Sequence, residues 1–160
     1  EISIDGSSFI NMSDKQISKF RNTNIGFVFQ FHQLLPEFTA LENVLLPTKI
    51  AGKSDAESVK KAIKLFEDLH IEERLHHKPS EMSGGEAQRT AVARALINSP
   101  KIIFADEPTG NLDSKNADDL HQLFFDLRDK YNQTFVIVTH NANLADVTDR
   151  KLEMKDGMII

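Results

Sequence analysis

Residues 101–113 read KIIFADEPTGNLD, an apolar run that ends in two adjacent carboxylates. A short apolar run of this kind is typical of a strand that is buried on both faces of a parallel sheet. Ligands of such sheets bind at the carboxyl ends of the strands, which is where Asp106 and Glu107 are placed. The run therefore predicts an α/β fold with a ligand site at the end of this strand.

Two further strands are predicted, NIGFVF at 24–29 and TFVIVT at 134–139, the second of them also as a buried strand. An amphipathic helix at 118–130 joins the strands at 101–105 and 134–139, and this order indicates parallel pairing. The sequence between Gln30 and Pro100 has mostly helical patterns. We therefore expect a parallel-sheet core that carries a helical insertion.

Capping boxes mark three helix starts, at Ser13, Thr39 and Ser54, and Pro47 should end or kink the second helix. Asp5-Gly6 and Asp156-Gly157 predict hairpin turns near the two ends of the chain. The expected inward faces of the three larger helices are Val59, Ile63, Phe66 and Leu69; Ala87, Ala91, Val92, Ala95 and Leu96; and Leu120, Leu123, Phe124 and Leu127.

The composition excludes several classes of protein. The net charge is −5 and the 19 Lys and Arg are scattered, so a nucleic acid is not expected as a partner. There are no cysteines, no apolar run of membrane-spanning length and no signal peptide, so we expect a cytoplasmic protein. The chain opens at EISIDG without a methionine, and we interpret it as a fragment.

Each polar group at a predicted strand or helix end has a chemical and a purely structural interpretation. Asp106 can hold Mg²⁺ through water and Glu107 can polarise an attacking water, or both can be solvated turn acids. Gln30 can touch a metal or water, and His140 can reach a phosphate, or both can simply be polar surface. Glycines behind an N-capping Ser83 can bind phosphate oxygens, or simply begin a well-capped helix.

Together, these motifs resemble those of the ABC-type ATPases. In chain order they are similar to the Q-loop, the signature sequence, Walker B with its catalytic acid, the D-loop and the H-loop: Gln30, Ser83–Gln88, Ile102–Glu107, Asn111–Asp113 and His140. The wording FVFQFHQLLPEFTALENVLLP and DEPTGNLDS is most similar to the branch of lipoprotein-releasing, macrolide-exporting and cell-division ATP-binding subunits. The resemblance implies a P-loop NTPase fold with units at 1–30, 31–99 (the helical subdomain) and 100–160.

The resemblance also implies a mechanism with ATP and Mg²⁺, in which two subunits sandwich two ATP molecules head to tail. Glu107 would be the general base, His140 would hold the γ-phosphate, and Gln30 and Asp106 would serve Mg²⁺ and the attacking water. Asp113 would link the two sites across the dimer. The residues implied to meet the nucleotide of the other subunit are Ser83, Gly84, Gly85, Glu86 and Gln88.

Membrane permease subunits are the other implied partners, which would place the protein on the inner face of the cell membrane. Phe29, Phe31, Leu34, Leu35 and Phe38 are candidates for that contact, or they pack inside the helical insertion. A soluble ABC-type module for DNA repair or translation, and a binding protein that does not hydrolyse ATP, are the alternatives. His70, His76 and His77 have no metal-ligand spacing.

The family's P-loop motif, G-x-x-x-x-G-K-[ST], does not occur in these residues. We therefore expect that an N-terminal portion is missing and that the chain cannot hold its own ATP. The strands KIIFA and TFVIVT should pack beside the missing P-loop strand. Without it, apolar core and a sheet edge would be exposed, so we expect low stability or a non-native association.

Overall fold

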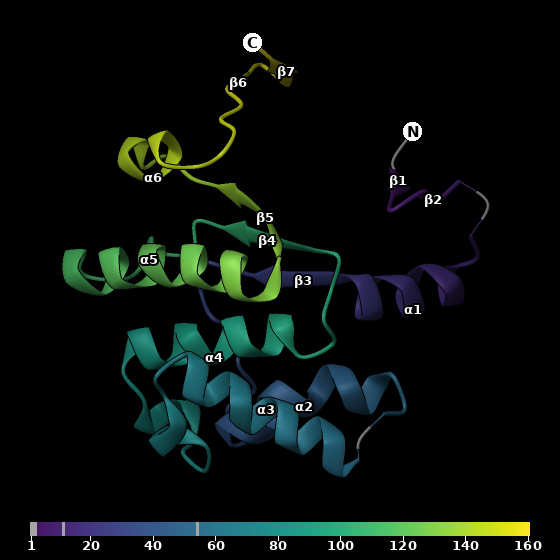
Figure 1. Cartoon of the computed structure of the whole chain (residues 1–160), viewed down its shortest axis with the longest axis vertical. Helices are drawn as coiled ribbons and strands as arrows, with labels where there is room; N and C mark the ends of the chain where they lie inside the picture. Colours follow the sequence, from purple (N-terminus) through teal and green to yellow (C-terminus); the bar gives the residue numbers. More distant parts are fainter. Residues whose placement is uncertain (1–2, 11, 54) are drawn as a thin grey trace.

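The centre of the computed structural model, which describes residues 3–10, 12–53 and 55–160, is a three-stranded parallel sheet. Its strands lie in the order β3 (Ile25–Val28), β4 (Ile102–Asp106) and β5 (Thr134–Val138) (Figure 1). Phe27, Phe104 and Val136 are partners in neighbouring strands, so they share one face of the sheet. The α/β class and the parallel pairing are confirmed.

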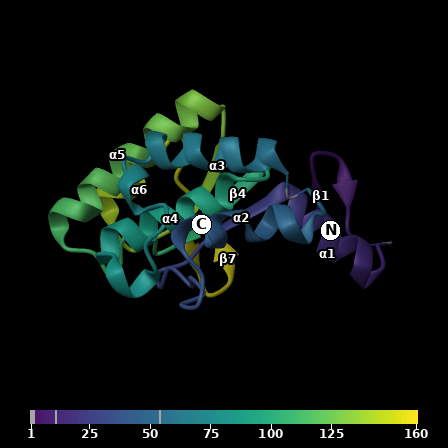
Figure 2. The same ribbon diagram turned by 90° about the horizontal axis from the view of Figure 1, so that it is seen from below.

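Two helices, α4 (Gly84–Leu96) and α5 (Ser114–Tyr131), pack on the other face of the sheet. Behind α4 lie α2 (Ala40–Ile50) and α3 (Ala56–Asp68), and Figure 2 shows these helices from below. The predicted inward residues of α4 and α5 are all buried. The remaining elements are α1 (Asp14–Asn24), α6 (Ala142–Asp146), the 3₁₀ turns η1 (Glu72–Arg74) and η2 (Pro79–Glu81), and the hairpins β1 (Ser3–Ile4) with β2 (Ser7–Ser8) and β6 (Met154–Lys155) with β7 (Met158–Ile159).

The packing of α4 on β3 is close because Gly26 faces the helix. A Cβ at this position would lie 2.8 Å from the carbonyl oxygen of Ala95 and 2.9 Å from Cγ1 of Ile103. The glycine therefore allows the helix backbone to approach the strand. The contact joins the end of α4 to the beginning of β3, and Gln88, near the start of α4, bonds to the carbonyl of Phe29 after the strand. The start of α4 therefore lies toward the carboxyl ends of the strands, where the predicted site lies.

Several local predictions differ from the structure. Of the two outcomes expected at Pro47, an end of the helix is excluded, because α2 continues through Pro47 to Ile50. Ser54 lies outside the described residues, and Asp55 caps α3 by accepting a hydrogen bond from the Ser58 N–H. The α3 face that packs inward includes the small Ala62, whereas Ile63 is exposed. Helix α5 begins four residues earlier than predicted because Asp113 is its N-cap.

The sheet differs from expectation in the burial and pairing of its strands. Strand β5 is only half buried, with Val136 40% and Val138 58% exposed, so it is not buried on both faces. Strand β4 has β3 on one side and β5 on the other, so KIIFA cannot pair with a further strand. Within the described residues, only β3 and β5 have an unpaired edge in this sheet.

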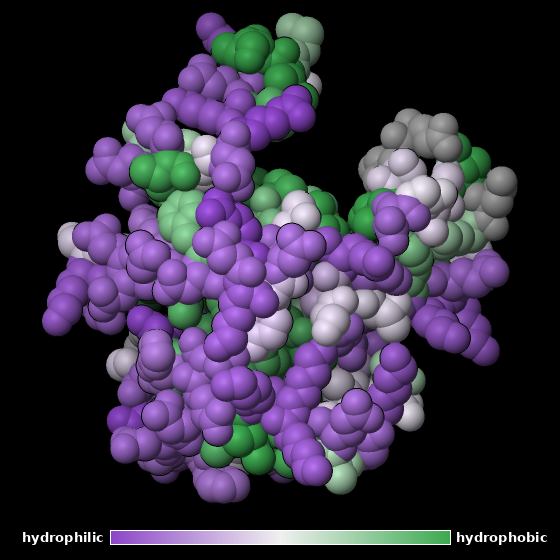
Figure 3. All heavy atoms as spheres, in the orientation of Figure 1, coloured by the Kyte–Doolittle hydropathy of each residue, from purple (hydrophilic) through white to green (hydrophobic). Residues whose placement is uncertain are grey.

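The sheet face opposite α4 and α5 carries exposed apolar side chains, as expected. Phe27 and Phe29 are 43% and 41% exposed, and the Phe27 ring stacks on those of Phe29 and Phe104. The space-filling view shows apolar atoms between the C-terminal hairpin and the N-terminal hairpin, and more of them on the C-terminal hairpin itself (Figure 3). The C-terminal segment with that hairpin exposes Leu152, Met154, Met158, Ile159 and Ile160.

Candidate functional site

The three parallel strands end at one edge of the sheet, and each supplies polar groups there. Asp106 is the last residue of β4 and Glu107 follows it. Gln30 and His140 each come two residues after the last residue of their strands, β3 and β5. The strand ends therefore place these four predicted residues on the same edge of the sheet.

Glu107 is bound tightly to the end of β5. Its N–H donates to the Val138 carbonyl at 2.9 Å, and its carboxylate accepts from the His140 N–H at 2.8 Å. Nδ1 of His140 lies 2.7 Å from the same carboxylate oxygen, and the Thr139 hydroxyl donates to the other at 3.2 Å. The Glu107 side chain is 21% exposed and that of His140 is 85% exposed. The predicted base and the predicted phosphate ligand are thus in direct contact.

Asp106 points to the sheet face opposite Ile103 and Ala105 and is exposed. Its carboxylate has no hydrogen-bond partner in the described part of the chain, so its oxygens are available to a cation. No group of three or more His, Cys, Asp or Glu among the described residues could hold a metal ion. A lone carboxylate can still serve Mg²⁺, which keeps several waters and takes one or two protein carboxylates.

Gln30 is linked to the segment that follows Glu107. Its Nε2 donates to Oδ1 of Asn111 at 3.2 Å, and Nδ2 of Asn111 donates back to the Gln30 carbonyl at 3.1 Å. A Cβ on Gly110 would lie 2.9 Å from Nε2 of Gln30, so the glycine leaves room for that side chain. The pairing leaves Oε1 of Gln30 for a metal or a water. Asn111 was predicted only as part of the D-loop, and this reciprocal contact could not be read from the sequence.

The start of α4 is a complete capping box. The Ser83 hydroxyl accepts from the Glu86 N–H at 3.3 Å, and the Glu86 carboxylate accepts from the Ser83 N–H at 2.7 Å. Arg74 donates to the other Glu86 oxygen at 2.8 Å. The hydrogen bond from Arg74, followed by that from Ser83, lowers the pKa of Glu86. Both oxygens of the Glu86 carboxylate therefore already accept hydrogen bonds within their own chain.

The N–H groups of Gly84 and Gly85 remain available at this helix start. No acceptor in the described part of the chain is hydrogen-bonded to them, as is usual for the first N–H groups of a helix. A Cβ on Gly85 would lie 3.2 Å from Oδ1 of Asn116, so this glycine also allows the beginning of α5 to come close. The N-terminal ends of α4 and α5 are neighbours.

Asp113 and Gln88 both have structural partners. Oδ1 of Asp113 accepts from the Asn116 N–H at 3.1 Å and so caps α5. Gln88 is only 2% exposed, and its Nε2 donates to the carbonyls of Phe29 at 2.8 Å and Pro108 at 2.9 Å. Gln88 thus ties α4 to the ends of both β3 and β4, which the sequence did not indicate.

The predicted residues fall into two groups. Gln30, Asp106, Glu107 and His140 lie at the sheet edge, while Ser83, Gly84 and Gly85 lie at the start of α4. Within the residues described, no hydrogen bond joins the second group to the carboxylates or the imidazole of the first. Gln88 of α4 connects them indirectly, because it donates to the carbonyls of Phe29 and Pro108 at the ends of β3 and β4. Thr139 was not predicted as a site residue, although it directly precedes His140 at the end of a predicted strand.

In segment 31–38, the candidates for contact with a membrane partner differ in burial. Leu34 is only 8% exposed and packs on Ala87 and Ala91 of α4, so it belongs to the interior. Phe31, Leu35 and Phe38 are 66%, 43% and 36% exposed. Leu34 is therefore an anchor of the segment, and the exposed side chains form its outer surface.

None of the described helices is both long enough and apolar enough to cross a lipid bilayer. This holds for α5, the longest of them, which has a polar and charged outer side.

Comparison with known proteins gives a consistent result. The family described as "ABC transporter" matches residues 1–110. The lipoprotein-releasing system ATP-binding protein of Bacteroides fragilis is 59% identical over 99% of this chain and 74% of that protein. The corresponding protein of Cytophaga hutchinsonii is 62% identical over 93% of this chain and 68% of that protein.

Solved structures show the same fold. A dimeric ATP-binding cassette in a post-hydrolysis state, bound to ADP and Pi, has a TM-score of 0.84 and 41% identity, covering 98% of this chain and 69% of that one. The cbiO1 protein of Clostridium perfringens, part of an ABC transporter complex, has a TM-score of 0.87 and 26% identity, covering 99% and 63%.

Proposed function

Since this chain belongs to the ABC transporter family of ATP-binding proteins, we propose that it is the ATPase subunit of a lipoprotein-releasing membrane complex. The observation that carries this proposal is the identity of 59–62% to lipoprotein-releasing ATP-binding proteins over nearly the whole chain. A DNA-repair or translation module has no observation in its favour.

In the proposed reaction Glu107 takes a proton from the water that attacks the γ-phosphate of ATP. Its carboxylate lies at the end of β4 and accepts hydrogen bonds from Thr139 and His140, which hold it in place. His140, with its exposed imidazole, hydrogen-bonds the γ-phosphate. Gln30 orients the water through the amide oxygen that Asn111 leaves unused.

Asp106 and Gln30 are the residues that we propose to hold Mg²⁺ with the nucleotide. The cation would neutralise charge on the phosphate oxygens during transfer. Both residues offer oxygen atoms, and Asp106 is exposed at the sheet edge without a competing partner among the described residues. This matches the oxygen-only preference of Mg²⁺.

The signature group is proposed to act on the nucleotide of a second subunit. The N–H groups of Gly84 and Gly85, behind the Ser83 cap, make no hydrogen bond to the carboxylates of their own chain's site. A helix N-terminus with unpaired N–H groups attracts a phosphate. Glu86, which accepts from Arg74, supports this helix start. Gln88 supports it too, by bonding to the ends of β3 and β4. Asp113, the cap of α5, lies beside it and would complete the contact between subunits.

The membrane subunits are proposed to contact the exposed side of segment 31–38 and Phe29. Three apolar side chains on this segment face solvent, which is unusual unless they meet a partner. Binding there would bring the protein to the inner face of the cell membrane.

The test uses the complete gene product, purified with and without its own membrane subunits. We expect a stable complex whose ATP hydrolysis drives release of a lipoprotein from proteoliposomes. ATP hydrolysis without any affinity for the membrane subunits would contradict the proposal, and so would a complex that releases no lipoprotein.

A further inference from the structure

Segment 31–38 has no helix or strand of its own, yet it is held by two side chains from the helices behind it. The first is Asn43 on α2, which is fully buried. Its Nδ2 lies 3.1, 3.2 and 3.0 Å from the carbonyl oxygens of Leu35, Phe38 and Thr39. Its Oδ1 accepts from the Leu35 N–H at 2.8 Å. One amide group thus satisfies three backbone groups of the segment that displays Leu35 and Phe38, and also the carbonyl of Thr39, the N-cap of α2.

The second side chain is Arg94 on α4. Its guanidinium donates to the carbonyls of Gln33 at 2.6 Å and His32 at 2.9 Å. Gln33 has a φ of 51°, a left-handed conformation that is uncommon for a residue other than glycine. The two hydrogen bonds lie on either side of this residue's α-carbon. Arg94 therefore fixes the backbone between Gln30 and the exposed part of the segment.

Both contacts are more than packing. A buried amide and a partly buried guanidinium are costly to desolvate, and here their hydrogen-bonding capacity is directed at one short irregular segment. Leu34, which lies between the two held positions in the sequence, packs on Ala87 and Ala91 of α4. The outer side chains Phe31, Leu35 and Phe38 are thereby displayed on a rigid backbone, which lowers the entropic cost of binding a partner.

We propose that Asn43 and Arg94 are positioning residues for the membrane subunits: they hold segment 31–38 in its docking shape and connect it to the Gln30 end of the site. This inference rests on the proposed function. It assigns a role to two residues that touch neither nucleotide nor partner.

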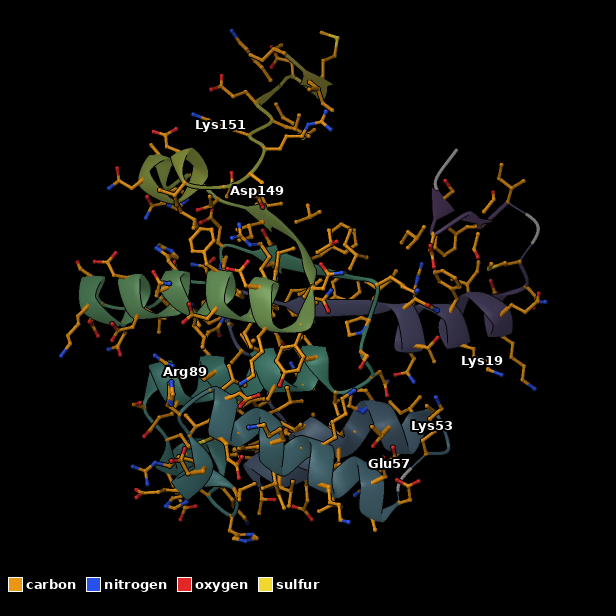
Figure 4. All side chains as sticks on the ribbon, viewed as in Figure 1. Lys19, Lys53, Glu57, Arg89, Asp149 and Lys151 are labelled. Atoms are coloured by element: carbon orange, nitrogen blue, oxygen red, sulfur yellow. The ribbon has the colours of Figure 1, made fainter. Side chains whose placement is uncertain are left out.

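The first experiment compares Arg94→Lys with Arg89→Lys in the complete gene product. Arg89 lies on the same helix and also donates to a backbone carbonyl, but to that of Leu69 at 3.1 Å, at the end of α3 (Figure 4). A lysine at either position keeps the charge, and at 94 a single ammonium cannot reproduce the two-point contact. We expect Arg94→Lys to weaken binding of the membrane subunits about tenfold, because a hydrogen bond to a charged group is lost. Arg89→Lys should bind as the wild type does.

A tryptophan at position 31 reports the shape of the segment, since the chain has no tryptophan of its own. In Phe31→Trp protein without membrane subunits, adding Arg94→Lys should lower the fluorescence anisotropy, and adding Arg89→Lys should not. A general loss of stability would instead lower the thermal midpoint of both variants and move the anisotropy of both.

Asn43→Asp gives a second, independent test. It keeps the shape of the side chain but removes the donors to three carbonyls, and we expect weaker binding of the membrane subunits. Its control is Thr48→Val on the same helix, because the Thr48 hydroxyl is also buried but, within the part of the chain that the structure describes, donates only to Leu45 of its own helix. If Asn43→Asp does not fold, the Arg94 comparison still decides.

The inference is overturned if Arg94→Lys and Arg89→Lys have equal affinity and equal anisotropy of the introduced tryptophan, or if both lose affinity in proportion to stability. In either case the wild-type complex would still form and the proposed function would stand. If the wild type itself binds no membrane subunit, the proposed function fails, and the inference fails with it.

Discussion

At the residue scale, Glu107 has an unusual backbone conformation that sets the direction of its side chain. Its φ of 43° lies in the left-handed region, where a side chain with a Cβ costs of order 1–3 kcal/mol. The hydrogen bonds of its N–H to Val138 and of its carboxylate to His140 hold this conformation. The turn aims the carboxylate across to β5, whereas Asp106, one residue earlier, stays at the end of its own strand.

We expect Glu107→Gln in the complete gene product to bind ATP normally but to lose turnover by about 10²–10⁴-fold, the usual worth of a general base. The amide can still accept from the His140 N–H, so the fold of the turn is kept. Nucleotide affinity and steady-state ATPase rates measure this, with the exposed Glu72→Gln as control. The ATP-bound dimer should accumulate in the variant. Wild-type turnover in Glu107→Gln would refute the assignment of Glu107 as the base. In a separate variant, His140→Ala, hydrolysis should also be impaired.

Gly110→Ala should affect activity more than stability. The new Cβ would come within 2.9 Å of Nε2 of Gln30, the far end of a flexible side chain that can move away. Unfolding by urea should then change by less than about 0.5 kcal/mol, while the ATPase rate falls because Gln30 is displaced. A Gln30→Ala, Gly110→Ala double variant should be no slower than Gln30→Ala alone. Additive losses of rate would show that the glycine acts elsewhere.

Much of the site could be predicted at this scale, because chemistry at strand ends depends on residue type and position alone. Asp106, Glu107 and His140 follow apolar runs, and Gln30 follows another, so parallel pairing brings them to one edge. The partners of Gln88 and Asn111 could not be predicted. Their hydrogen bonds span 59, 20 and 81 residues and depend on how α4 and the turn after Glu107 meet.

At the scale of elements, helix starts were predictable where a cap precedes an apolar pattern, as at Ser13, Thr39 and Ser83. The start of α5 was not, because the residues from 114 to 119 have no large apolar side chain to mark a helix. On α3 the small Ala62 takes the inward place expected for Ile63. A small side chain contributes little to a periodic pattern even where close packing requires it.

Gly26→Ala should destabilise the chain strongly, since α4 lies too close to β3 for a Cβ. The nearest atom, 2.8 Å away, is the backbone oxygen of Ala95, which cannot move without the helix. Overpacking of this kind costs about 1–3 kcal/mol. Gly84→Ala is the matched control, because its Cβ would meet only Cδ2 of Leu112 at 3.7 Å. Equal urea midpoints for the two variants would contradict the assigned packing.

Asp68 joins α3 to α5, and its charge should make stability depend on pH. Burial alone would raise its pKa, but hydrogen bonds from Lys130, Tyr131 and Lys64 outweigh burial and lower the pKa to about 2. A lowered folded-state pKa means that this stabilisation is complete above the unfolded value of about 4 and is lost as the pH falls toward 2.

Asp68→Asn should therefore cost about 1.5–3 kcal/mol at pH 7, the range for hydrogen bonds to a charged group. Unfolding free energies measured from pH 7 to pH 2 should show the wild type losing its advantage over the variant between about pH 4 and 2. The control is Asp126→Asn, because among the described residues the Asp126 carboxylate accepts only from Gln122 on the same helix. A constant difference between wild type and Asp68→Asn across that window would contradict the assignment.

At the scale of the whole molecule, the sequence predicted parallel strands but not their order. All three strands are short and apolar, so nothing in their composition distinguishes a central strand from an outer one. The structure puts β4 between β3 and β5 and leaves β5 half exposed. His140 follows β5, which is an outer strand of this sheet. The strand order therefore places the site next to a sheet edge that is unpaired within the described residues.

The open face of the sheet should make the 160-residue chain associate with itself when it is studied alone. Phe27, Phe104 and Val136 lie side by side in register, and the outer two are 43% and 40% exposed. A contiguous apolar surface of this kind favours association, whereas a single exposed residue does not. We expect sedimentation velocity to find species larger than a monomer, and the Phe27→Ser, Val136→Thr pair to increase the monomer fraction. Ile50→Ser, on α2 and 74% exposed in the wild type, should leave the distribution unchanged. A wild-type chain that stays monomeric at high concentration would show that this face does not drive association.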